Sequence, residues 1–136
     1  MSIRMTDAEA LFALLRLAAL SGAIPSARES TDYWSSRLMS LKRFATMDID
    51  EVSELTRKVA NLVADNPREA LLAAIAEALS PQARLAAFSL ATDVILADAV
   101  LELPEREALT RIQAALDIPD DTAEKITEVM LIKNSF

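Results

Sequence analysis

Apolar residues recur along most of the chain at intervals of three and four, the spacing that places them on one face of an α-helix. In the first such stretch, Leu11, Leu14, Leu15 and Ala18 share a face. Changes in the pattern predict helices over residues 7–20, 27–43, 49–64, 67–78, 81–97, 104–116 and 119–132. We therefore expect an all-α fold, a single compact bundle of about seven helices that forms one domain over residues 1–136.

Helix boundaries are marked by capping residues. A Ser, Thr or Asp followed three residues later by Glu predicts capping boxes at Thr6/Glu9, Ser26/Glu29 and Asp48/Glu51. Proline suits the first turn of a helix, where its missing N–H costs nothing, so every proline except Pro25 is expected there. We expect Asn66 and Ser80 to be the N-caps before Pro67 and Pro81, and Gly22 to end the first helix.

The helix expected over 81–97 is apolar on almost every side, since only three residues from Leu85 to Ala97 are polar. A helix of this kind is surrounded by others, so it is the expected centre of the bundle, with Leu90, Val94 and Ile95 buried. Asp93 lies in the same stretch and, as a carboxylate among apolar residues, needs a partner.

The composition argues against catalysis. The chain has no Cys and no His, which removes disulfides, thiolate chemistry and the usual base at neutral pH. A single glycine excludes the glycine-rich phosphate-binding loops. We therefore expect a protein without enzymatic activity.

The charge is acidic and uneven. The net charge is −7, and residues 85–136 hold 10 acidic and 4 basic side chains, a net of −6. This balance argues against nucleic-acid binding and suits a cationic partner or a hard metal ion, although the acids can also simply be a solvated surface. The longest uncharged run, Leu17–Ala27, has 11 residues, whereas a membrane span needs about 20. Charged residues interrupt the first apolar stretch, so we interpret it as the first helix of a cytoplasmic protein.

One acidic cluster lies around the expected connection between 81–97 and 104–116. It comprises Asp93, Asp98, Glu102, Glu105 and Glu107. Carboxylates on both sides of a tight loop can bind Ca²⁺ or Mg²⁺. Alternatively, Glu105 and Glu107 are first-turn acids that compensate the helix dipole, and Asp98 is an Asx cap.

Two segments resemble one another. Residues 17–29 and 94–107 each have an apolar helix end, a turn of small residues, and a proline-bearing acidic helix start. The repetition predicts two helix–turn–helix halves with pseudo-twofold symmetry.

Ala97–Leu101, followed by Pro104–Glu107, resembles the A-D-G-x-[aliphatic]-x-x-x-E signature of the TerB-like family, the tellurite-resistance TerB proteins and their stand-alone bacterial relatives. The resemblance implies a helical bundle, a cytoplasmic setting, a role in tellurite or general stress resistance, and acidic residues proposed to bind divalent metal. Asp98 matches the signature Asp, Ala99 replaces its Gly, and either Glu105 or Glu107 is the signature acid.

The resemblance implies a metal site of Asp98, Glu105 or Glu107, and Asp93, which matches an acidic position five residues before Asp98. In the first half Ser21 replaces the corresponding Asp. We expect a non-enzymatic stress-resistance protein that acts through an unidentified protein partner and weak Ca²⁺ or Mg²⁺ binding. The alternative is a helical scaffold or homodimerisation module without a ligand.

Overall fold

The computed structural model of the chain describes residues 3–21 and 36–136. Within these ranges the backbone forms helices and no strand, which confirms the expected all-α bundle of about seven helices. The bounded elements are α1 (Asp7–Ala19), the 3₁₀-helix η1 (Lys42–Phe44), α4 (Ile49–Asp65), α5 (Arg68–Ala78), α6 (Pro81–Ile95), α7 (Leu103–Leu116) and α8 (Asp120–Asn134). Of the described helices, none is long and apolar enough to cross a membrane.

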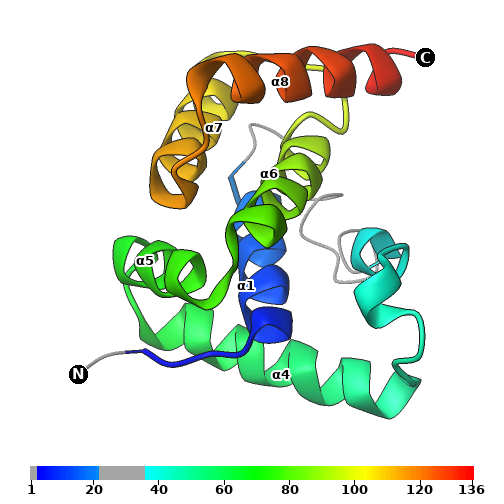
Figure 1. Ribbon diagram of the computed structural model, residues 1–136, viewed down its shortest axis with the longest axis vertical. Coiled ribbons are helices and arrows are strands. Elements are labelled where there is room, and N and C mark those ends of the chain that lie inside the picture. The colour runs from blue at the N-terminus through cyan, green and yellow to red at the C-terminus, as the bar shows by residue number, and fades with distance from the viewer. Residues whose placement is uncertain (1–2, 22–35) are drawn as a thin grey trace.

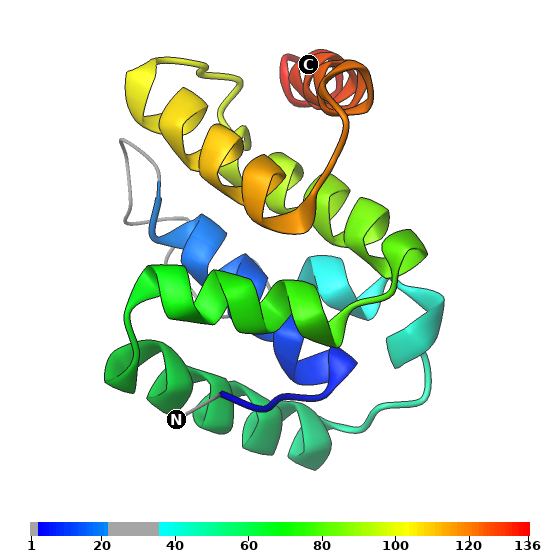
Figure 2. The same cartoon turned by 60° about the vertical axis from the view of Figure 1, so that its left-hand side comes forward.

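The helices are arranged from one end of the molecule to the other (Figures 1 and 2). α4 lies across one end, and α1, α5 and α6 fill the middle. α7 and α8 lie at the opposite end, where each packs on α6 and hardly contacts the other. α6 therefore connects the central helices to the α7–α8 pair.

The most deeply buried helix is α1, so the prediction that 81–97 forms the centre is wrong. Every residue of α1 from Ala8 to Ala19 is buried except Arg16. α1 packs against α4, α5 and α6 together, whereas α6 leaves Leu85 exposed to solvent. Within α6, Val94 and Ile95 are fully buried as expected, but Leu90 is only half-buried.

Local capping chemistry accounts for several helix starts. The Thr6 hydroxyl accepts a hydrogen bond from Glu9 N at 3.1 Å, and the Glu9 carboxylate accepts one from Thr6 N at 2.7 Å. Asp48 and Glu51 form the same reciprocal pair at α4. Ser80 Oγ accepts from Ala83 N at 3.2 Å, with Pro81 as the first residue of α6. These three predicted caps are confirmed.

Two proline predictions need correction. Pro67 and Pro119 are the N-caps of α5 and α8, so each helix begins one residue later than expected. Both have extended ψ values of 147°, and their carbonyl oxygens accept the first helical hydrogen bonds. Asn66 is therefore not an N-cap, and its side chain donates to Leu62 O at 2.9 Å, at the end of α4. Pro104 does lie in the first turn of α7.

The helix expected over 27–43 ends earlier than predicted. Residues 36–39 are helical, but a turn and η1 follow. This turn brings Phe44 into the core, where its ring meets Phe12 edge to face with centroids 5.6 Å apart. The start of this helix, its inward-facing residues before Ser36, the Ser26/Glu29 box, Gly22 and Pro25 lie outside the described residues. Most of the segment 17–29 lies there too, so the pseudo-twofold symmetry stays a prediction.

Candidate functional site

The four carboxylates predicted as metal ligands occupy different environments. Asp93 lies in α6, Asp98 in the connection to α7, and Glu105 and Glu107 in the first half of α7. Over residues 3–21 and 36–136, no three His, Cys, Asp or Glu side chains are grouped so that they could hold a metal ion. Each of the four carboxylates has its own contacts within the fold.

Asp98 is exposed and shapes the connection between α6 and α7. Its Oδ1 accepts a hydrogen bond from Val100 N at 3.3 Å, the contact of an Asx turn. Ala99, between them, has a left-handed φ of 60°. A non-glycine residue is disfavoured in this conformation, because its Cβ crowds the backbone. This is the position at which the TerB-like signature has glycine.

Glu105 and Glu107 are close in sequence but differ in burial and in hydrogen bonding. Glu105 is fully buried, and its Oε1 accepts a hydrogen bond from Glu102 N at 2.9 Å. It therefore satisfies a backbone donor at the start of α7, as an N3 acid does in a capping box. Glu107 is exposed to solvent.

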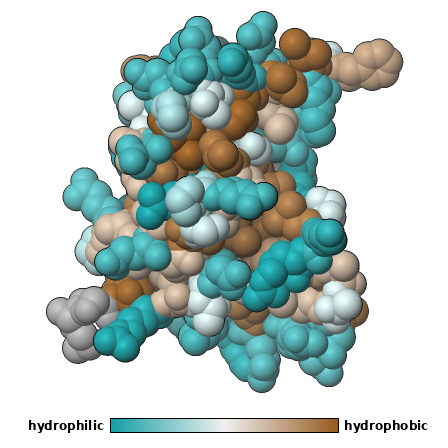
Figure 3. Space-filling view, in the orientation of Figure 1, coloured by the Kyte–Doolittle hydropathy of each residue, from teal (hydrophilic) through white to brown (hydrophobic). Residues whose placement is uncertain are grey.

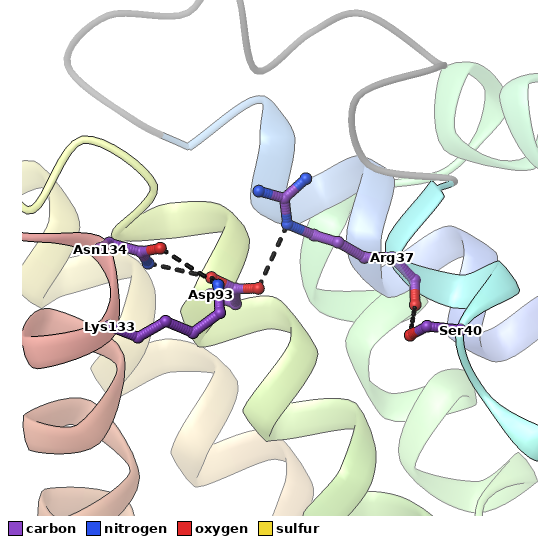
Figure 4. A network of polar contacts seen from close by, with 5 residues as sticks. All are labelled: Arg37, Ser40, Asp93, Lys133 and Asn134. Carbon is purple, nitrogen blue, oxygen red and sulfur yellow. Dashed lines mark hydrogen bonds and ion pairs between the residues drawn. The ribbon is translucent and has the colours of Figure 1, made fainter. Parts of the chain in front are cut away.

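Asp93 is the centre of a polar network that joins three parts of the chain (Figure 4). Its Oδ1 accepts hydrogen bonds from Asn134 Nδ2 at 2.9 Å and Lys133 Nζ at 3.1 Å. Its Oδ2 lies 3.3 Å from Arg37 Nε. The carboxylate thus holds the last turn of α8 and the segment at Arg37 against α6, and these are the partners that a buried carboxylate requires.

The network stabilises the charged form of Asp93. Burial raises the pKa of this carboxyl, but the hydrogen bonds from Asn134 and Lys133 and the charge of Arg37 outweigh burial and lower it below its ordinary value. Asp93 therefore stays ionised at neutral pH. Both of its oxygens are occupied by protein donors, so in this arrangement it acts as a positioning residue for α8.

The α7–α8 groove is the concave region between α7 and α8, above α6. Its volume is about 640 Å³. The half-buried Leu101 and Leu131 form its apolar floor, with the buried Phe88 and Leu109 beneath them. Figure 3 shows hydrophobic surface in this upper part of the molecule, bordered by hydrophilic side chains. The groove exists because α7 and α8 diverge over a common support instead of packing together.

Both ends of α8 are fixed, so the groove is held open. At the start of α8, Gln113 Nε2 donates to Asp120 Oδ1 at 2.7 Å and to Ile118 O at 3.1 Å. Asp117 makes the tight turn between the helices with a left-handed φ of 55°. At the other end, Asn134 is bound to Asp93. A groove with fixed walls loses little conformational entropy when a ligand binds.

The wall of the groove on α8 is acidic. Asp120, Glu124 and Glu128 follow one another at every fourth position and line the groove, while Arg106 is the one basic lining residue among those that the structure describes. Sequence reasoning missed this site, since it singled out the acids before and within α7. The sequence does show three acids at every fourth position of the last helix. It does not show that α7 lies opposite them.

Comparisons of the chain with protein-family models, with curated proteins and with solved structures find no match.

Proposed function

We propose that this is a non-enzymatic, TerB-like protein of tellurite or general stress resistance, which acts by binding a partner protein in the α7–α8 groove. The observation that carries the proposal is the groove itself, an apolar depression whose walls are fixed at both ends by Gln113–Asp120 and Asp93–Asn134. Sites that bind protein segments combine such an apolar floor with a polar rim.

The TerB-like part of the proposal rests on the connection between α6 and α7. Asp98 stands at the signature Asp, and the left-handed Ala99 stands where the signature has glycine. A conformation that favours glycine at this position is what an A-D-G turn needs. The absence of His and Cys from the whole chain supports a role in binding rather than in catalysis.

A dimerisation module is the alternative, favoured by an apolar stripe on the outer side of α8. Val129 and Ile132 are 56% and 68% exposed, and the terminal Phe136 is exposed beside them in sequence. A stable interface buries about 800 Å² on each partner, more than these three side chains supply. Each copy also carries a net charge of −7, which opposes self-association.

A genetic experiment tests the proposed function. In the organism that encodes the chain, deleting the gene is expected to lower survival on tellurite, and the wild-type gene is expected to restore it. Thr127→Trp, which fills the groove from α8, is expected not to restore survival. The control Ala64→Trp changes an exposed position on α4 and should restore it. Equal survival with both variants would contradict the assignment of the groove.

A further inference from the structure

The shape of the α7–α8 groove points to a helical ligand. Its two walls are faces of helices, with lining residues at Arg106, Thr110 and Gln113 on α7, and every three to four residues along α8. Ridges at this spacing are what another helix packs against. With a rise of 1.5 Å per residue, the acids from Asp120 to Glu128 extend over roughly 12 Å, or about two turns of a helix lying alongside.

The charge of the groove specifies the ligand further. Glu124 and Glu128 are exposed, and neither has a hydrogen-bonding or ion-pair partner among the side chains that the structure describes. Asp120 has its contact with Gln113, and within the described part of the chain Arg106 is the one opposing charge in the lining. The groove therefore presents carboxylates above an apolar floor, and its complement has Lys or Arg beside apolar residues.

On this basis we propose that the occupant of the groove is an amphipathic basic helix of a partner protein. Its apolar face would lie on Leu101 and Leu131, and a row of Lys or Arg at every fourth position would lie along Glu124 and Glu128. This inference rests on the proposed function of the groove and names the chemistry of the partner. A second copy of the chain fits poorly because it carries the same net charge of −7.

The test uses a designed helical peptide of about 18 residues, long enough to hold a helix, with Leu on one face and Lys at every fourth position beside it. A matched peptide has Glu in place of Lys. Fluorescence anisotropy with the full chain should show binding of the Lys peptide, weakened by raising NaCl from about 50 to about 300 mM, and none of the Glu peptide.

Variants of the chain locate the contact. Glu124→Gln with Glu128→Gln should weaken binding of the Lys peptide by about tenfold, since two rim charges are lost. The control, Asp65→Asn with Glu77→Gln, removes the same charge from exposed positions on α4 and α5 and should change the affinity less than twofold. Thr127→Trp should block binding at low and high salt alike. Circular dichroism melting checks that each variant remains folded.

Three results would overturn the inference. They are equal binding of the Lys and Glu peptides, equal weakening by the α8 pair and its control, or a dimer in sedimentation velocity that Thr127→Trp dissociates. The last result would assign the groove to a second copy. If the peptide fails to bind but Thr127→Trp still loses tellurite resistance, the groove remains the interaction site and only the chemistry of its occupant is wrong.

Discussion

Lys133 Nζ lies 3.1 Å from Asp93 Oδ1, although the two residues are 40 positions apart in the chain. The contact joins the last turn of α8 to the last turn of α6, beside the buried Val94. Asn134 supports the same oxygen, and Arg37 approaches the other oxygen from outside the α6–α8 pair. One carboxylate therefore holds the C-terminal end of α8 against the rest of the bundle.

Asp93→Asn should lower the free energy of unfolding by about 2 kcal/mol at pH 7, because charge-assisted hydrogen bonds to a buried group are lost. The pKa of Asp93 is lowered in the folded protein, so its stabilisation is complete above its ordinary value and disappears as pH falls through the folded value. The stability difference between wild type and Asp93→Asn should therefore shrink below about pH 4.

Urea denaturation from neutral to acidic pH measures this difference. Lys133→Met is the companion variant, since it removes only the contact of a side chain that is 55% exposed and should cost less than about 1 kcal/mol. A difference between wild type and Asp93→Asn that stays constant from about pH 7 to about pH 3 would show that the carboxylate charge does not hold α8.

Ala99→Gly should stabilise the protein by about 0.5–1 kcal/mol. The left-handed φ of 60° at Ala99 strains an alanine, and glycine relieves this strain at the cost of a more flexible unfolded chain. Ala114→Gly is the matched control, since Ala114 is exposed within α7 and the same change there should destabilise by about 1 kcal/mol. Thermal denaturation distinguishes the two, and destabilisation by both would refute the strain at Ala99.

The sequence predicted the interactions that form between residues close together in the chain. The capping boxes at Thr6 and Asp48 need only a side chain and the backbone three residues away, so they were predicted correctly. The partners of Asp93 lie 56, 40 and 41 positions away, and no local pattern indicates them. The groove depends on the angle between α7 and α8, which Gln113 and Asp93 determine through tertiary contacts.

The central position of α1 was missed for a related reason. Glu9 makes the sequence of α1 look amphipathic, yet the residue is only 5% exposed. Its carboxylate caps the helix and pairs with Lys58 Nζ at 2.5 Å. A polar residue whose charge is neutralised locally can enter a buried helix. Apolarity alone therefore favoured α6. Each of the two helices contacts three others, but only α1 is buried along nearly its whole length.

Leu14→Ala should cost about 2–5 kcal/mol, the usual range for a cavity in a packed core, because Leu14 is fully buried in α1. Leu85→Ala makes the same chemical change in α6, where the side chain is 41% exposed, and should cost about 1 kcal/mol. Chemical denaturation of both variants compares the two helices. A larger loss at Leu85 than at Leu14 would contradict the central position of α1.

The last prediction decides between the two interpretations of Asp98. The side chain is exposed and accepts a hydrogen bond from Val100 N, so it acts as a turn-forming residue. Asp98→Ala should then cost about 1 kcal/mol, whereas Asp98→Asn, whose amide oxygen accepts the same bond, should cost much less. Ca²⁺ or Mg²⁺ at millimolar concentration should leave the melting temperature unchanged, since Glu105 is engaged by Glu102 N and Asp93 by Lys133 and Asn134.

A metal site gives the opposite pattern in the same melting experiment. A bound ion would raise the melting temperature by linkage, and Asp98→Asn would abolish the rise without destabilising the metal-free protein. Glu107→Gln serves as a second variant, because this exposed carboxylate is one of the two α7 acids expected to bind the ion together with Asp98. A metal-dependent rise that both variants remove would show that the acidic connection binds an ion. If Asp98→Ala is the only variant that loses stability, and loses it equally with and without metal, Asp98 is a turn-forming residue.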